Sequence, residues 1–312
     1  MFNIRFNIFA IKQIEFMFNV INPNNIRLNS QIYLKPEYEI HPQVSGNKFR
    51  KLKYNIQDFR KRNCKGILTF GGAYSNHIAA TAAAGNILGF KTLGIIRGLE
   101  LSKNIENNPT LKYANENGMK FEFISRNNYR KKNHPEFIKS LLIKYPKYYI
   151  IPEGGTNDLG VKGCEEILCE NDFDFDIICC SIGSGGTISG IINSSKPNQK
   201  ILGFPALKNR SIHKDICKFA KQSNWKLIEN YHFGGYAKVN LELIEFMNDF
   251  KRKFKITLDP IYTAKMLYGV FDLIKKKMIS SDDKVLVIHT GGLQGIKGMN
   301  KYLKDNNFDL II

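Results

Sequence analysis

Lys48 is the residue of this chain best placed for covalent chemistry. It follows a Gly-Asn pair and stands at the start of a helix predicted from Phe49 to about Arg62. The positive end of that helix, with Arg50 and Lys51 close by, should favour loss of the ammonium proton. The neutral amine that results can form a Schiff base with an aldehyde. In a chain with 46 Lys and Arg residues such a tripeptide is more often incidental, so the interpretation depends on other motifs.

A second motif could bind an anion. The apolar segment Gly66 to Phe70 predicts a buried strand, which is followed by two glycines, by Ser75 and Asn76, and by an alanine-rich helix. Free backbone N–H groups and short polar side chains at a helix N-terminus suit a carboxylate. Ser75 or Asn76 could equally be a plain N-cap with no role beyond the helix. The turn by itself favours neither interpretation.

A glycine-rich loop forms the third motif. It follows the predicted strand Asp176 to Ile182 and precedes a helix predicted from Ile188 to Asn193. The loop consists of Gly183, Ser184, Gly185, Gly186 and Thr187. Consecutive glycines let the backbone approach an anion closely, and the two hydroxyls add donors. Since the loop has no P-loop lysine and no acidic partner about twenty residues later, it favours a monophosphate over ATP or a dinucleotide.

These motifs stand at the ends of strands in a repeating order. Between Gly66 and Ile151 predicted strands alternate with helices, and the alternation resumes from Asp176 to His289. Repeated strand-helix units predict an α/β fold in which mostly parallel sheets are covered by helices. Ligands of such sheets bind at the carboxyl ends of the strands, where the glycine turns lie. With no internal repeat and no low-complexity linker, a second domain should be inserted rather than appended.

Composition narrows the function classes. At 312 residues with 43% hydrophobic residues, the chain can bury a substantial core in one or two domains. A net charge of +18 raises nucleic acid as a partner, but the charge is spread along the chain without a nucleic-acid motif, so we expect no nucleic-acid function. No apolar run approaches the length that spans a bilayer, which predicts no membrane partner.

Cysteine usage and the N-terminal segment bear on location. The six cysteines show no metal-ligand spacing, and a reduced, cytoplasmic compartment fits them best. Cys179 and Cys180 lie in an apolar strand and are predicted to be small core residues. The aromatic-rich segment Met1 to Val20 does not resemble a secretory signal, so we expect a loosely attached leader, with Met17 as an alternative start.

A lysine placed for a Schiff base, a phosphate loop and a carboxylate turn together describe a pyridoxal phosphate enzyme that acts on an amino acid. The chain also resembles the 1-aminocyclopropane-1-carboxylate deaminase and D-cysteine desulfhydrase family over nearly all residues beyond about residue 30. The shared motifs, in chain order, are Gly46–Lys48, Gly72–His77, Gly183–Thr187, Leu258–Lys265 and His289–Gly292. Each motif alone is weak, and their common order and spacing make the resemblance specific.

The resemblance implies the two-domain fold of the tryptophan synthase β type. A small α/β domain of residues 49–157 would be inserted into a large cofactor-binding domain of residues 1–48 and 158–312. Each domain would contain a mostly parallel sheet covered by helices. A homodimer is implied as well, which is also the commonest symmetric assembly.

Cofactor roles follow from the same resemblance. Lys48 would hold pyridoxal 5'-phosphate as a Schiff base, Asn76 would hold the ring hydroxyl, and Thr263 would face the pyridine nitrogen. The phosphate would be held by Lys51 together with Gly183, Ser184, Gly185, Gly186 and Thr187. Thr290, in the last glycine turn, is implied to bind the cofactor too.

Substrate roles are implied for three further residues. Ser75 would bind the carboxylate of a small amino-acid substrate, and Tyr262 aligns with the family's catalytic tyrosine. Tyr236 aligns with a second active-site tyrosine, although by itself either tyrosine would more often be a core or rim aromatic. The chain departs from the family at residues 35–38, where Lys-Pro-Glu-Tyr replaces an Arg-Glu-Asp-like run, and this leaves substrate access open.

Thr263 is the position that distinguishes the deaminases of this family from the desulfhydrases. Deaminases carry a glutamate there, which keeps the pyridine nitrogen protonated for opening a ring that has no free α-hydrogen. Threonine offers a neutral hydrogen bond, as in the desulfhydrases, so we expect β-elimination from D-cysteine to pyruvate, ammonia and hydrogen sulfide, with Lys48 as the base at Cα. The alternatives are a 1-aminocyclopropane-1-carboxylate deaminase, a non-catalytic pyridoxal phosphate-binding protein and a basic nucleic-acid-binding protein.

Overall fold

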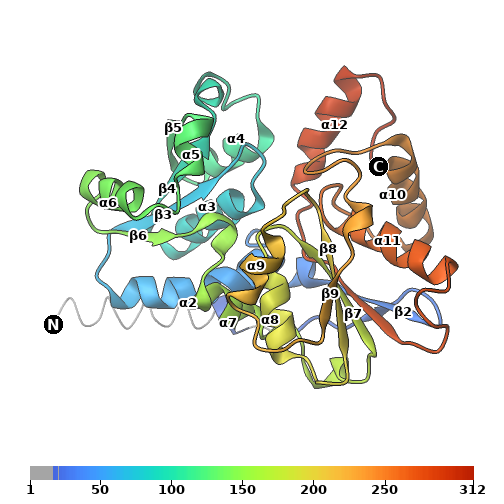
Figure 1. Cartoon of the computed structure of the whole chain (residues 1–312). Helices are drawn as coiled ribbons and strands as arrows, with labels where there is room; N and C mark the ends of the chain where they lie inside the picture. Colours follow the sequence, from blue (N-terminus) through green and yellow to red (C-terminus); the bar gives the residue numbers. More distant parts are fainter. Residues whose placement is uncertain (1–16, 20) are drawn as a thin grey trace.

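Two β-sheets organise the computed structural model, which describes residues 17–19 and 21–312 (Figure 1). The strands are β1 (Ile26–Arg27), β2 (Ile32–Lys35), β3 (Gly66–Gly71), β4 (Lys91–Arg97), β5 (Lys120–Ile124), β6 (Tyr148–Ile151), β7 (Ile177–Ile182), β8 (Lys200–Pro205), β9 (Trp225–Leu227) and β10 (Val285–Ile288). The helices are α2 (Asn47–Lys61), α3 (Asn76–Leu88), α4 (Pro109–Glu116), α5 (Arg126–Arg130), α6 (Pro135–Lys144), α7 (Asp158–Cys164), α8 (Gly186–Ser194), α9 (Ile212–Cys217), α10 (Leu241–Phe254), α11 (Thr263–Lys275) and α12 (Gly295–Asp305).

The strand pairing is almost entirely parallel, as predicted. The six-stranded sheet has the order β1-β2-β10-β7-β8-β9, and the four-stranded sheet has the order β5-β4-β3-β6. Only β1 and β2 pair antiparallel among the described strands. Strand β10, close to the C-terminus, lies between β2 and β7, so that Val285 pairs with both Ile32 and Ile177. The α/β fold class is therefore confirmed.

Strand β7 shows why these segments are strands that are buried on both faces. Ile177 and Cys179 pack into one hydrophobic cluster, with helices α10 and α11, whereas Ile178, Cys180 and Ile182 pack into another, with helix α8. Successive side chains of a strand point to opposite faces, so a strand covered on both sides must be apolar throughout. The two cysteines are fully buried core residues, as predicted.

The two sheets divide the chain as an insertion would. All four strands of the smaller sheet lie between residues 66 and 151, and every strand of the larger sheet lies outside that range. In Figure 1 the smaller sheet and helices α3 to α6 form one half of the molecule, and the larger sheet with α8 to α12 forms the other. The exact domain boundaries, after residues 48 and 157, stay a prediction.

Helices α2 and α7 join the two halves. A Cβ added to Gly163 of α7 would lie 1.9 Å from the carbonyl oxygen of Arg50 in α2, so the two backbones touch at this glycine. Helix α2 extends from the small half of the molecule toward the larger sheet (Figure 1). Its N-terminus, and with it Lys48, comes to lie beside the ends of β7 and β10.

Among the strands and α-helices of the described residues, β1, α5 and α12 were not predicted from the sequence. The expected leader was partly wrong, because Met17 and Phe18 are buried and the Phe18 ring lies 4.8 Å from that of Phe49. The rest of that segment, residues 1–16 and 20, lies outside the described residues, as does any test of the start site. No helix among the described residues has the length and apolarity to cross a membrane.

Candidate active site

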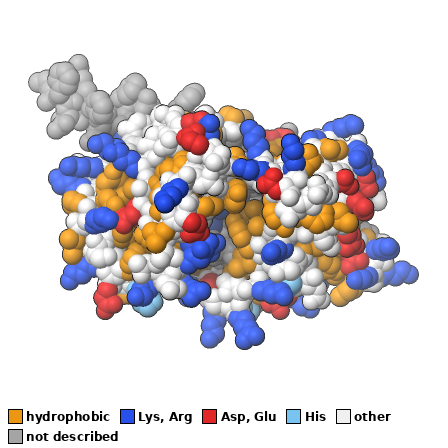
Figure 2. Space-filling view, turned by 90° about the horizontal axis from the view of Figure 1, so that it is seen from above, with side chains coloured by type: hydrophobic (Ala, Val, Ile, Leu, Met, Phe, Trp, Pro, Cys, Tyr) orange, Lys and Arg blue, Asp and Glu red, His pale blue; other side chains and the backbone are white. Residues whose placement is uncertain are grey.

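A cavity of about 860 Å³ lies between the two halves, at the carboxyl ends of β3 and β7. In Figure 2 the molecule is hollowed near its middle, with Lys and Arg side chains around the hollow. The predicted site residues that line this cavity are Lys48, Lys51, Ser75, Asn76, Gly183, Ser184, Gly185, Thr187, Tyr236, Tyr262 and Thr290. The two predicted residues that do not line it are Gly186 and Thr263. Segments more than two hundred residues apart in the chain thus meet at one site.

Lys48 lies in the first turn of α2. The helix begins beside the turn after β10, because the Asn47 N–H donates to the carbonyl oxygen of Thr290 at 3.1 Å. Gly46 has a φ of +65°, and an added Cβ would lie 2.0 Å from that same carbonyl, so only glycine fits. Burial, and then the charge of Lys51, lower the pKa of Lys48 to about 7. The predicted loss of the proton is supported, but its main cause is desolvation, and Arg50 pairs instead with Glu37.

Lys51 forms one side of an anion cradle. Its buried ammonium donates to the carbonyl oxygen of Gly154 and to Thr156 Oγ1, both at 3.0 Å, and lies 3.5 Å from Ser184 Oγ. Thr156 and Ser184 also share a hydrogen bond of 2.6 Å. The first N–H groups of α8 have no acceptor within the helix, so they are available to an anion there. A cation, two hydroxyls and a helix N-terminus thus converge.

Gly186 explains why this cradle has room for a ligand. A Cβ at this position would lie 2.8 Å from Thr156 Oγ1 and 3.1 Å from Lys51 Nζ. Any larger residue would therefore fill the space between the loop and the lysine. Gly185, which precedes it with a φ of +86°, makes the sharp turn into α8 that no β-branched residue would adopt easily.

The turn before α3 fits both roles predicted for it, as a helix N-cap and as part of a ligand site. Ser75 is the N-cap of α3 and accepts from the Ile78 N–H at 3.3 Å, which confirms the structural role. Its side chain also lines the cavity, as does Asn76. Gln294, in the turn before α12, donates to Asn76 Oδ1. That contact fixes the amide of Asn76 at the cavity wall, with its nitrogen toward Gly292.

His77 presents an unpaired acceptor beside the cavity. The Thr69 hydroxyl donates to the carbonyl of Ile151 at 2.9 Å, so at its 2.8 Å contact with His77 Nε2 it must accept. The proton of the neutral imidazole is then on Nε2, and Nδ1 is a buried acceptor without a partner among the described residues. Burial, followed by the charges of Lys48 and Lys51, lowers the pKa of His77 well below its usual value.

The N-terminus of α11 is built around a buried aspartate. Asp259 accepts from the backbone N–H groups of Ile261, Tyr262 and Thr263 at 3.1, 2.8 and 2.8 Å. Thr263 is fully buried, and its Oγ1 has no partner among the described residues. A buried hydroxyl without a partner is unfavourable, so this atom is suited to a ligand that supplies one.

The rings of Tyr262 and Tyr236 are in contact in the wall of the cavity. Their ring centroids are 6.3 Å apart at an interplanar angle of 66°, an edge-to-face contact. Tyr262 also packs over the glycine loop, because a Cβ on Gly183 would lie 3.1 Å from its ring. Burial, and then the neighbouring Tyr236 and Asp259, raise the pKa of Tyr262 well above its usual value, so the phenol stays protonated.

The residues of the cavity fit pyridoxal phosphate. An amine with a lowered pKa, a glycine-lined cradle with a cation, and an unpaired hydroxyl at the N-terminus of α11 match the aldehyde, the phosphate and the ring nitrogen of that molecule. The sequence had missed Thr156 and Gln294. Thr156 follows β6 and two glycines, the same strand-and-glycine signal as the other motifs, whereas Gln294 carries no local signal.

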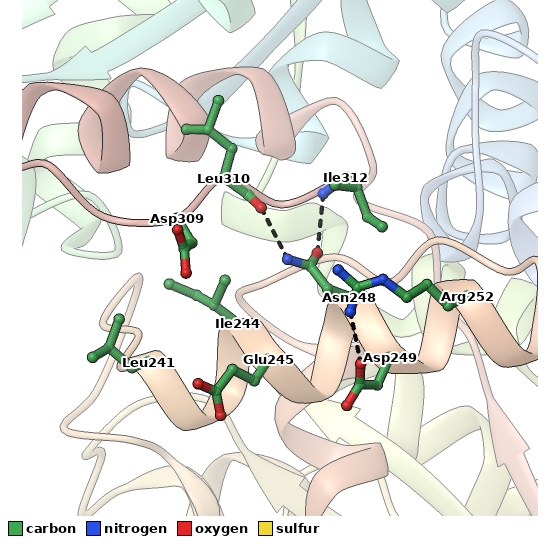
Figure 3. Close-up of a pocket in the computed structure, with 9 residues that line it drawn as sticks. All are labelled: Leu241, Ile244, Glu245, Asn248, Asp249, Arg252, Asp309, Leu310 and Ile312. Atoms are coloured by element: carbon green, nitrogen blue, oxygen red, sulfur yellow. Dashed lines mark hydrogen bonds and ion pairs between the residues drawn. The ribbon is translucent and has the colours of Figure 1, made fainter.

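A second cavity, of about 450 Å³, lies far from this chemistry, between α10 and the C-terminal residues (Figure 3). Asn248 donates to the carbonyl oxygen of Leu310 and accepts from the Ile312 N–H, each at 3.0 Å. Arg252 pairs with Asp249 on the exposed side. The groups shown there tie the C-terminal segment to α10, and none is a predicted site residue.

Comparisons with known proteins agree with the geometry. A family described as pyridoxal-phosphate dependent enzymes matches residues 20–291. A protein of Pyrococcus furiosus, provisionally named 1-aminocyclopropane-1-carboxylate deaminase, is 32% identical over 301 residues and covers 88% of both chains. The mitochondrial bifunctional D-cysteine desulfhydrase/1-aminocyclopropane-1-carboxylate deaminase of Arabidopsis thaliana is 29% identical over 294 residues, 86% of this chain and 73% of its own.

Solved structures show the same fold. The crystal structure of a 1-aminocyclopropane-1-carboxylate deaminase homologue superposes with a TM-score of 0.77 at 24% identity, over 94% of this chain and 98% of the other. With the family match and the cavity described above, the chain belongs to the pyridoxal-phosphate dependent enzymes and, within them, to the 1-aminocyclopropane-1-carboxylate deaminase and D-cysteine desulfhydrase family.

Proposed function

We propose that this enzyme is a D-cysteine desulfhydrase-like lyase, which converts D-cysteine and water to pyruvate, ammonia and hydrogen sulfide. The observation that carries the proposal is the neutral, unpaired hydroxyl of Thr263 at the N-terminus of α11. A hydroxyl does not hold a proton on a pyridine nitrogen as a carboxylate does. The site is then suited to a substrate with an acidic α-hydrogen and a good leaving group at Cβ.

Each proposed role follows from a position in the cavity. Bound to Lys48, pyridoxal phosphate supplies a ring that withdraws electrons from the α-carbon of an amino acid. Lys51, Thr156 and the N-terminus of α8 would hold its phosphate, because a cation and free N–H groups converge there. Asn76 would face the ring hydroxyl from the other wall.

Lys48 would accept the proton from the substrate, and Tyr262 would stabilise the leaving group. With a pKa of about 7, the amine of Lys48 is largely neutral just above neutral pH and can accept the α-proton. Ser75 and the N–H groups of its turn would orient the substrate carboxylate. The buried phenol of Tyr262 keeps its proton and can donate a hydrogen bond to the sulfur, which leaves as hydrosulfide when the Cβ–S bond breaks. The 2-aminoacrylate that leaves hydrolyses to pyruvate and ammonia.

A second candidate is the deaminase activity on 1-aminocyclopropane-1-carboxylate. It is favoured by the names of the relatives, one of which carries both activities. The third alternative is a non-catalytic protein that binds the cofactor. Its cofactor absorption band would not change when any amino acid is added. A homodimer and a cytoplasmic location stay predictions.

One titration separates these candidates. The purified protein is loaded with pyridoxal phosphate, and D-cysteine, L-cysteine, D-serine and 1-aminocyclopropane-1-carboxylate are added in turn. We expect hydrogen sulfide and pyruvate from D-cysteine, together with a change in the visible spectrum. Turnover of the cyclopropane substrate without any hydrogen sulfide from D-cysteine would refute the proposal.

A further inference from the structure

Lys265 is a buried lysine to which the proposed mechanism assigns no role. It lies in the first turn of α11, and only 1% of its surface is exposed. Its ammonium donates to the carbonyl oxygen of His232 at 2.9 Å and to that of Gly235 at 2.7 Å. A buried ammonium is unfavourable unless its N–H groups find acceptors, so these two carbonyls are what make its burial possible.

The carbonyls belong to a loop with an unusual backbone. Phe233, Gly234, Gly235 and Ala237 all have positive φ, of 50°, 88°, 126° and 55°. Positive φ is unfavourable for Phe and Ala, and such a run persists only where its surroundings hold it. Within the loop the Gly235 N–H donates to the His232 carbonyl at 3.0 Å. Lys265 therefore binds the same carbonyl that closes the turn.

Tyr236 is the residue that this loop delivers to the cavity. It follows Gly235 directly and lies edge to face with Tyr262, which is the N-cap of α11. Tyr262 thus stands at the start of α11. Tyr236 stands in a loop that is contacted by Lys265, from the first turn of the same helix. Asp259 fixes the first through backbone N–H groups, and Lys265 contacts the loop of the second.

We propose that Lys265 is the positioning residue for Tyr236, which it holds against Tyr262 by binding the 232–235 loop. The catalytic consequence rests on the proposed function, and it also requires that Tyr236, which lines the cavity, contact the substrate there. That Lys265 holds the loop in place does not depend on the proposed function, since its contacts with the two carbonyls are present whichever amino acid is the substrate.

The test begins with the cofactor-free protein. Lys265→Met keeps the length and apolar stem of the side chain and removes its donors, and Lys275→Met on the exposed end of α11 is the matched control. We expect hydrogen exchange of the peptide that contains residues 234–238 to rise at least tenfold in Lys265→Met and to stay unchanged in the control. Lys265→Arg, which keeps charge and donors, is expected to fall between Lys265→Met and the wild type. Unchanged exchange in a folded Lys265→Met protein would overturn the proposal.

The second measurement is a double-mutant cycle in the loaded enzyme with whichever substrate turns over. If Lys265 acts through Tyr236, Lys265→Met should lower kcat/KM about tenfold in the wild type and by less than twofold in a Tyr236→Phe background. An equal loss on both backgrounds would mean that Lys265 acts through the fold at large, and would overturn the positioning role. Absence of D-cysteine turnover in the wild type refutes the proposed function instead, and leaves the exchange result to decide on Lys265.

Discussion

At the scale of single residues, the burial of Lys48 determines how its reaction with the cofactor should depend on pH. Its pKa of about 7 lies below the usual value because burial and the ammonium of Lys51 disfavour the charged form. A group with a lowered pKa is protonated below that value and neutral above it. Below about pH 7 only the small neutral fraction of the amine can attack the aldehyde of pyridoxal phosphate, and above it most of the amine can.

We predict that the rate at which the cofactor-free protein acquires its visible absorption band with pyridoxal phosphate rises about tenfold per pH unit below pH 7 and levels off above it. Stopped-flow absorbance between pH 5.5 and 8.5 measures this rate. Lys48→Ala should give no band at any pH. A band that forms in Lys48→Ala would show that another amine holds the cofactor.

Thr263 allows a stability effect to be separated from a cofactor effect. Its hydroxyl has no partner among the described residues, and Asp259 holds only its backbone N–H. Thr263→Val should therefore stabilise the cofactor-free protein by about 1 kcal/mol, since no hydrogen bond is lost and an unpaired buried hydroxyl is removed. Thermal unfolding without cofactor checks this expectation.

The same variant should change the loaded enzyme. If the hydroxyl faces the ring nitrogen, Thr263→Val leaves that nitrogen without a partner and should reduce kcat on D-cysteine by roughly tenfold, about 1.4 kcal/mol in the barrier. Steady-state kinetics with the hydrogen sulfide assay measures the loss. An unchanged kcat would place the ring nitrogen elsewhere.

At the scale of elements, the proposed role of helix α8 in phosphate binding depends on the glycine that is its first residue. A Cβ on Gly186 would lie 2.8 Å from Thr156 Oγ1, an atom that Lys51 and Ser184 already hold. We predict that Gly186→Ala weakens the affinity for pyridoxal phosphate at least tenfold, because overpacking a site of this kind costs about 1–3 kcal/mol.

A titration of the visible band with the cofactor measures this affinity. Ser194→Ala, at the other end of α8, is the control and should bind the cofactor as the wild type does, because its hydroxyl donates only to carbonyls within the helix. Equal affinities for Gly186→Ala and the wild type would remove α8 from the cofactor site.

At the scale of the whole molecule, buried ion pairs tie the segment around β2 to the rest of the chain. Glu37 accepts two hydrogen bonds from Arg50, at 2.9 and 2.8 Å, and both side chains are almost fully buried. Lys35 pairs with Asp172 at 2.7 Å. Lys35 and Glu37, in the segment expected from the sequence to differ from the family, thus form structural contacts, and the Glu37–Arg50 pair links this segment to α2.

We predict that Glu37→Gln destabilises the protein by about 3 kcal/mol, because it removes the closer and more deeply buried of the two carboxylates that pair with the Arg50 guanidinium, the other being Glu166 at 3.9 Å. Equilibrium unfolding in urea measures the free energy of unfolding. Asp249→Asn, which removes an exposed ion pair with Arg252, is the control and should change it by less than about 1 kcal/mol. A loss no larger for Glu37→Gln than for this control would mean that the pair does not hold the two halves together.

The sequence by itself determined the strands, most helices and the glycine turns, because these depend on residues that are near neighbours in the chain. It also identified Lys48, Ser75 and the Gly183–Thr187 loop as candidates, since Lys48 stands at a recognisable helix start and the other two follow recognisable strands. Hydrophobic periodicity and the φ preferences of glycine are local properties, and a single sequence displays them.

Only the tertiary structure decided which distant groups meet. Thr156 joins Lys51, Gln294 joins Asn76, and Lys265 reaches the loop before Tyr236, although nothing in the local pattern pairs them. The paired residues are 105, 218 and 30 positions apart in the chain. Strand order and helix crossings are set by the packing of the whole core, which is why a local pattern could not reveal them.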